Sequence, residues 1–158
     1  MSAYALYTDI ENQTGLTFTS STAIKQATID SWIASESARL DGYLKQAGYL
    51  APASGTNAHE WCKDTVVMIV CWRVEKRRFE GKQSGNKSDR GNELREEYYA
   101  RIMELTGTDP RTGKSTEAGR VNILTDATPD PSFGALPTNY WTHRGKTKEY
   151  QFTDDMEH

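Results

Sequence analysis

The sequence predicts a mainly α-helical protein: a small bundle of three long helices, a short N-terminal helix, and an extended C-terminal arm that contains short β segments. Apolar residues recur at helical spacing in three stretches between residues 20 and 107. Residues 107–158 instead hold four of the five prolines and show no helical period. We therefore divide the chain into a helical body, residues 1–107, and an arm, residues 108–158.

Two helices are expected in the first third of the chain. The stretch "YTDIENQTGL" predicts a short helix capped at Thr8 and closed by Gly15. Residues 20–22 then offer N-caps for a long amphipathic helix of about 25 residues that ends near Gly48. Gly42 lies inside this helix, where glycine costs about 1 kcal/mol against alanine, so we expect it to mark a close helix contact. The apolar positions of this helix are Ile29, Trp32, Ile33, Leu40, Tyr43, Leu44 and Ala47.

The next two helices follow a linker that contains Pro52 and Gly55. A helix from about Thr56 carries apolar residues around much of its circumference, which predicts that it is the central one. It becomes charged at "RVEKRRFEGK", and a glycine-containing polar loop follows. Asp89 or Asn92 is expected to cap the last helix, "ELREEYYARIMEL". Its apolar stripe consists of Leu94, Tyr98, Ile102 and Leu105.

The arm combines weak strand signals with isolated aromatic residues. "RVNIL" and "KEYQF" alternate weakly, as short strands do. A disordered tail is normally depleted in aromatic residues, so an arm that carries them is expected to dock on another protein. The residues predicted to dock are Phe133, Tyr140, Trp141, Tyr150 and Phe152.

Length and composition exclude several classes of protein. A chain of 158 residues has the size of one ordinary domain. The net charge of −3 argues against a protein that wraps nucleic acid, because phosphate neutralisation requires an excess of Lys and Arg. No apolar run approaches the roughly 18 residues needed to span a bilayer, and no secretory signal is visible. We therefore expect a protein made in a cytoplasm that contacts no membrane.

The stretch "GTDPRTGKST" ends like a nucleotide-binding P-loop but departs from its pattern. The first glycine of G-x-x-x-x-G-K-[ST] belongs at Thr108, whereas the nearby glycine is Gly107. A P-loop also follows a buried strand and precedes a helix, but "EYYARIMEL" reads as a helix and "STEAGR" as a polar turn. The stretch is therefore predicted to be a helix end followed by a polar linker.

No arrangement of residues in the sequence indicates a metal site or an enzyme. His59 and Cys62 are spaced i, i+3, but a zinc site needs three or four ligands. Cys71 lies nine residues after Cys62, a rise of about 13 Å along one helix, which is too far for a disulfide. No positioned base is recognisable for a nucleophile, and the acidic "DDMEH" is expected to fray. We expect no catalytic activity, no metal and no cofactor.

The strongest charge feature is the run "RVEKRRF". From Arg73 to Arg101 the chain contains nine Lys and Arg and six Asp and Glu. The rest of the chain contains ten Lys and Arg and sixteen Asp and Glu. One interpretation is a solvated helix end, where cations are favourable by about 0.3 to 1 kcal/mol each. The other is a basic edge that meets the acidic edge of a second copy. The residues of this predicted subunit interface are Arg73, Lys76, Arg77 and Arg78.

Residues 20–107 resemble a known family. "RLDGYLKQAGYLAP" matches an "IDGYL"-like motif followed by a turn with proline. The apolar helix that ends in Cys71 to Arg78 matches a second element, and "R-x-x-Y…A…L" before Gly107 matches a third. This pattern is similar to that of the tailed-bacteriophage head–tail connector adaptors, including the Mu-like head-completion proteins. The arm resembles the extended C-terminal arms that reach the portal in related adaptors.

The resemblance implies a structural virion protein. In that family, copies form a ring, commonly of twelve, beneath the portal protein in the neck between capsid and tail. The ring extends the DNA channel, through which DNA passes without specific binding, and it offers a docking platform for a tail-side stopper, terminator or neck protein. The alternative from the residues alone is a small helical nucleic-acid-binding or regulatory protein that uses the basic stretch 73–82.

Overall fold

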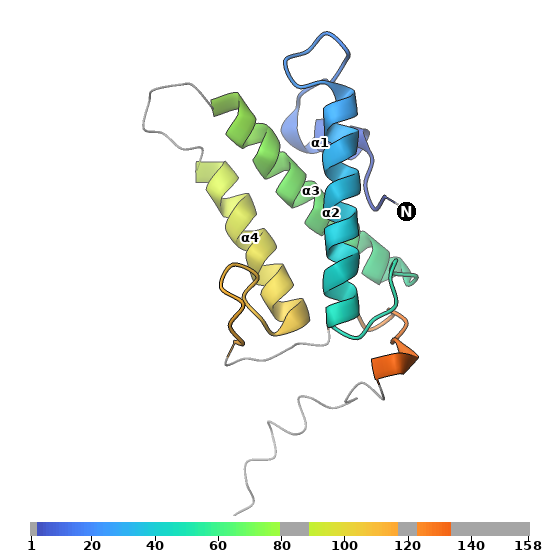
Figure 1. The fold of residues 1–158 in the computed structure, drawn as a ribbon. Coiled ribbons are helices and arrows are strands. Elements are labelled where there is room, and N and C mark those ends of the chain that lie inside the picture. Colours follow the sequence, from blue (N-terminus) through green and yellow to red (C-terminus); the bar gives the residue numbers. More distant parts are fainter. Residues whose placement is uncertain (1–2, 80–88, 117–122, 134–158) are drawn as a thin grey trace, which may run out of the picture.

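Three long helices, each antiparallel to the next along the chain, form the body of the protein (Figure 1). The computed structural model describes residues 3–79, 89–116 and 123–133. These hold α1 (Tyr7–Thr14), α2 (Gln26–Gln46), α3 (Thr56–Phe79), α4 (Asp89–Thr106) and the 3-10 turn η1 (Pro131–Phe133). The predicted mainly α fold is confirmed for this part of the chain.

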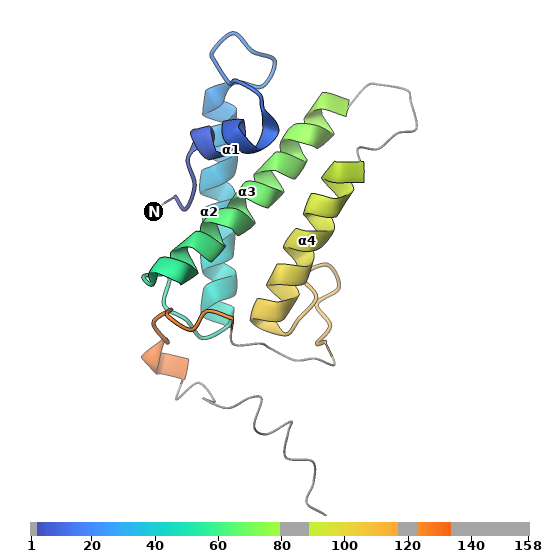
Figure 2. The ribbon, with the colours of Figure 1, turned by 180° about the vertical axis from the view of Figure 1, so that it is seen from behind.

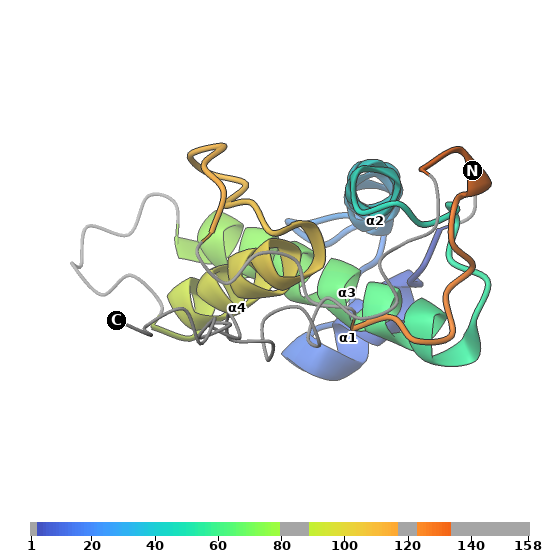
Figure 3. The same ribbon diagram turned by 90° about the horizontal axis from the view of Figure 1, so that it is seen from below.

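Helix α3 occupies the centre of the bundle, as its apolar circumference predicts. It packs against α1, α2 and α4. The view from behind shows α1 lying in front of α2, on the side where α3 also packs (Figure 2). The view from below shows α3 flanked by α2 and α4 (Figure 3). Buried side chains on α3 that form the core include Val66, Ile69, Val70 and Val74.

The predicted starts of the first two helices are wrong by two and by several residues. α1 begins at Tyr7 after Leu6, and its Asp9 carboxylate accepts the Leu6 N–H at 2.8 Å, so Thr8 is no cap. α2 begins after Lys25. The hydroxyl of Thr22 instead accepts a hydrogen bond from the Thr19 N–H at 3.0 Å, in a turn that precedes the helix. The Thr22 hydroxyl therefore forms a hydrogen bond within this local turn and does not cap α2.

Gly15, Gly48 and Gly107 lie at helix ends as predicted, whereas Gly42 does not mark a contact. Gly15 and Gly107 follow α1 and α4 with φ of 68° and 70°, the left-handed conformation that closes helices. Gly42 is exposed, and a Cβ built on it would meet nothing within 4 Å. The expected close helix contact at Gly42 is therefore wrong.

One segment of the predicted arm, residues 123–130, packs on the helical body. Residues 123–130, which we call the strap, cross the turn between α2 and α3 (Figure 1). The Leu50 N–H donates to the Thr128 carbonyl, and the Asp130 N–H donates to the Gly48 carbonyl, each at 2.9 Å. Leu124 is buried against the core. The strap thus fixes this part of the arm at the end of the bundle where α3 begins.

The predicted short strands are not formed where the structure describes the chain. The described ranges contain two isolated β-bridges, between Tyr49 and Pro129 and between Thr108 and Ser115. "KEYQF" lies outside these ranges, as does part of "RVNIL". Among the described helices, none is long and apolar enough to cross a bilayer.

Candidate functional site: a cleft of tryptophans and cations

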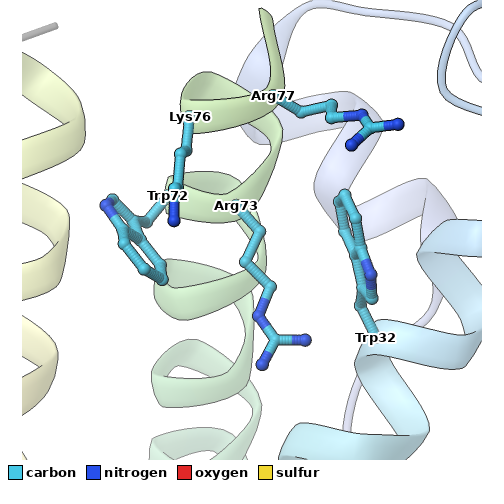
Figure 4. A pocket seen from close by; sticks show the side chains of 5 residues that line it. All are labelled: Trp32, Trp72, Arg73, Lys76 and Arg77. Atoms are coloured by element: carbon cyan, nitrogen blue, oxygen red, sulfur yellow. The ribbon is translucent and has the colours of Figure 1, made fainter. Parts of the chain in front are cut away.

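A cleft runs across α3 near its C-terminal end, from Trp72 on the side that faces α4 to Trp32 on α2 (Figure 4). It has a volume of about 320 Å³ and is lined by Trp32 from α2 and by Trp72, Arg73, Lys76 and Arg77 from α3. The close view shows Arg73 reaching into the space between the two helices and Arg77 extending toward α2 near Trp32 (Figure 4). These five residues are called the cleft below.

A buried carboxylate on α2 orients one of the two arginines of the cleft. Glu36 is 1% exposed and forms a salt bridge with Arg73. Its other cationic neighbour is Arg39, one turn along α2, whose guanidinium lies 3.4 Å from the Glu36 carboxylate. One buried negative charge therefore faces two guanidinium groups. Because burial of an ionised carboxylate is costly unless it is paired, Arg73 is held in place by this salt bridge.

Cations also lie over the tryptophan rings. The Lys76 ammonium is 5.5 Å from the centre of the Trp72 ring, and the Arg95 guanidinium of α4 is 5.9 Å from it. Arg73 lies 6.0 Å from the Trp32 ring centre. These separations are in the range of cation–π attraction, which is worth about 0.5 to 1 kcal/mol at exposed sites. The rings thus support the cations as well as forming apolar walls.

The exposed charges at the C-terminal end of α3 are positive. Glu36 on α2 and Glu75 on α3 are buried, whereas Lys76, Arg77 and Arg78 are exposed. These two acidic groups thus face inward and the three basic groups face solvent. A surface of this kind suits an anion that is attached to an apolar or aromatic group, such as a carboxylate in a peptide.

Three of the four predicted interface residues line the cleft. Arg78, the fourth, does not line it and forms a 3.3 Å salt bridge with Glu75 one turn earlier on α3. The η1 turn includes the backbone of Phe133, whose side chain lies outside the described part. The other aromatic residues predicted to dock, Tyr140, Trp141, Tyr150 and Phe152, also lie outside the described residues. Their docking stays a prediction.

The apolar spacing of α2 predicts that Trp32 faces the core, whereas the structure places it half-buried in the wall of the cleft. Trp72 and Lys76 are four residues apart on one helix, and this spacing is a signal that they meet. Glu36 also carried a signal, because it lies between Ile33 and Leu40 on the apolar face of α2. The approach of Trp32 to Arg73 has no local signal, because the two residues belong to different helices.

The cysteines are packed in the core of the bundle. Both Cys62 and Cys71 are free and buried on α3. Burial raises the pKa of each thiol to about 12, so both are protonated at neutral pH. His59 lies beside Tyr4, with 5.5 Å between ring centres. Among the described residues, no three His, Cys, Asp or Glu side chains are grouped so that they could hold a metal ion.

The "GTDPRTGKST" stretch forms a polar loop after α4. The helix ends at Thr106, and the chain turns so that the Asp109 N–H donates to the Lys114 carbonyl at 2.9 Å. The Asp109 carboxylate accepts the Arg111 N–H at 2.8 Å. The segment before the loop is a helix, so the strand that precedes a P-loop is missing at this position.

The chain matches no family model, no curated protein and no solved structure. The resemblance to connector adaptors therefore rests on the sequence pattern, and a proposal of function rests on the cleft and the strap.

Proposed function

We propose that this chain is a structural adaptor of the head–tail connector of a tailed bacteriophage. Copies assemble into a ring beneath the portal protein, extend the DNA channel, and provide the platform on which a stopper or neck protein of the tail docks. The chain has no enzymatic role in this proposal and uses no cofactor. Its place is the virion neck, between capsid and tail.

The observation that carries the proposal is the placement of two different surfaces at opposite ends of α3. The cleft uses residues 72–77, near the end of this helix, and the strap contacts residues 57 and 58 at its start. Residues 58 and 72 are 14 positions apart, a rise of about 21 Å along this helix, so the two surfaces do not overlap. An adaptor needs such a separation because it contacts neighbouring copies and other proteins at the same time.

The charge of the chain supports assembly into a ring. The segment from Arg73 to Arg101 has three more cations than anions, and the rest of the chain has six more anions than cations. A basic cleft on one copy can therefore meet acidic groups on the next copy. Such a head-to-tail interface uses two different surfaces, and it closes into a ring when the rotation between copies allows.

Purification of the tagged chain from the cells or particles that contain it tests the proposal. We expect a portal-sized ring protein and tail components to accompany the chain, with ring-shaped assemblies in electron micrographs. A chain cut after Phe133 keeps the strap and is expected to stay helical but to lose the portal or tail protein. Recovery of the chain with nucleic acid alone, or with a metabolic enzyme, would contradict the proposal.

One observation favours a second candidate, a small nucleic-acid-binding protein. Tryptophan rings beside cations resemble the surfaces on which single-stranded nucleic acids stack. In that case, binding to an oligonucleotide falls steeply with added salt, and replacement of Arg77 and Arg78 by glutamate abolishes it. Against this candidate, cations already lie near the rings of Trp32 and Trp72.

A further inference from the structure

We propose that the cleft binds the acidic segment of residues 150–157, "YQFTDDME", from a second copy of this chain. This assignment deepens the proposed function, on which it rests, by naming the group that the ring interface recognises. The segment contributes carboxylates to the cations of the cleft and aromatic rings to its tryptophans.

The composition of the segment complements that of the cleft. Asp154, Asp155 and Glu157 lie within four residues, and no Lys or Arg occurs between residues 150 and 157. Phe152 and Tyr150 lie two and four residues before Asp154. The cleft has the matching pair of properties, with exposed Lys76 and Arg77 beside two partly buried tryptophans. Opposite charge sets orientation and encounter rate, and aromatic groups supply contact area.

Two exposed carboxylates of α4 are poorer candidates for the cleft. On α4, Glu96 already pairs with Arg95 and Arg111, at 3.2 and 2.9 Å. Glu97 lies 3.6 Å from Arg101 on the same helix. Cations next to these groups would repel Lys76 and Arg77 of another copy. The segment 150–157 brings no such cation.

The chain is long enough for the segment to leave its own body. The strap fixes residue 130 at the end of the bundle where α3 begins, and η1 ends at Phe133. From Phe133 to Asp154 the chain advances 21 residues, which span up to about 70 Å when extended. This exceeds the roughly 36 Å length of α3, so the segment can reach the cleft of a neighbour. Exchange of such an element between identical copies is a low-cost route to assembly.

Charge reversal in the full chain tests the proposal. K76E/R77E changes the cleft, and D154K/D155K/E157K changes the segment. K45E/K114E is the matched control for the cleft variant, because it reverses two exposed lysines that do not line the cleft. Sedimentation velocity at micromolar concentration and low salt measures self-association. We expect the wild type and the control to associate, and each charge reversal to weaken association by roughly tenfold or more.

A mixing experiment identifies which copy supplies the segment. K76E/R77E retains an intact segment and D154K/D155K/E157K retains an intact cleft, so a mixture of the two is expected to form a one-to-one complex. A chain that carries both sets of changes is expected to associate again, because the charges are exchanged. Far-UV circular dichroism of each variant checks that the helices remain.

Four results would overturn the inference. The first is a wild-type chain that stays monomeric. The second and third are self-association that is unchanged in the segment variant or in the cleft variant. The fourth is self-association of the chain that carries both sets of changes, without any complex in the mixture of the two variants. The proposed function is judged separately. If the segment variant still enters rings with the portal protein, the inference fails and the adaptor function stands. If virions lack the chain but purified copies associate through the segment, the adaptor function fails and the inference stands.

Discussion

The carboxylate of Asp126 accepts a hydrogen bond of 2.9 Å from the backbone N–H of Ala58, which lies 68 residues earlier in the chain. A second oxygen of Asp126 accepts the Asn57 N–H at 2.7 Å. These amides belong to the first turn of α3, where backbone N–H groups have no partner within the helix. Gly55, whose carbonyl accepts the first helical bond from the His59 N–H, has no side chain with which to cap them. The strap therefore caps the central helix from a distance.

Replacement of Asp126 by alanine is expected to destabilise the fold by about 1 kcal/mol, which is the usual cost of losing an N-cap. Urea denaturation followed by circular dichroism measures the change. Asp126→Asn is the intermediate comparison, because its single amide oxygen can keep one of the two hydrogen bonds, while the other bond and the charge at the helix N-terminus are lost. We expect a smaller loss for asparagine than for alanine, and an alanine variant as stable as the wild type would contradict the capping role.

Two glycine substitutions are expected to change the free energy of unfolding in opposite directions. A Cβ on Gly55 would overlap the backbone and carboxyl group of Asp126, so Gly55→Ala displaces the strap and lowers the free energy of unfolding. At Gly42 a Cβ has open space inside α2, so Gly42→Ala raises the free energy of unfolding by up to about 1 kcal/mol. Thermal unfolding of both variants checks this. A destabilised Gly42→Ala protein would show that the site is covered.

Arg73→Ala is expected to cost about 2 kcal/mol, because it leaves the buried Glu36 carboxylate with Arg39 as its remaining ion-pair partner. Arg78→Ala is the control, since its pair with Glu75 is more exposed and should contribute less than about 1 kcal/mol. A double-mutant cycle with Glu36→Gln isolates the coupling, which we expect to be favourable. Equal losses for Arg73→Ala and Arg78→Ala would contradict this assignment.

Stability is expected to fall at alkaline pH. Burial raises the pKa of Cys62 and Cys71 to about 12 from an ordinary value of 9.0, and burial raises the pKa of Tyr4 and Tyr98 as well. Above pH 9 the unfolded chain therefore loses thiol protons that the folded chain keeps, so the free energy of unfolding decreases as pH rises. Urea titrations between pH 7 and about 11 measure this slope. In a Cys62→Ala/Cys71→Ala protein, the decrease should begin nearer the ordinary tyrosine pKa of 10.0.

The two thiols are expected to react slowly with Ellman's reagent in the folded protein. Both are buried and protonated near neutral pH, and the thiolate is the reactive form. Two thiols per chain should become reactive at once when the protein is unfolded in guanidinium. Rapid reaction of one thiol under native conditions would show that α3 is accessible at that position.

The helices could be predicted from the sequence because their signal is local. Val70 and Val74 on α3, and Tyr98 and Ile102 on α4, recur at three- or four-residue spacing that follows from the geometry of one helix. Glu36 also lies at helical spacing on the apolar face of α2, so its position indicates burial. A pattern that counts apolar residues alone misses it. The first turn of α2 was placed too early, because the Thr22 hydroxyl bonds within its own turn.

Periodicity determined most of the residues of each helix that face the core, and the basic run included three residues of the cleft. The tertiary structure decided that Trp32 meets the cations of α3, that Arg73 pairs with Glu36, and that Asp126 caps α3. Each of these contacts joins residues about 40 or more positions apart. Their free energy depends on how two elements pack, and no spacing along the chain records that.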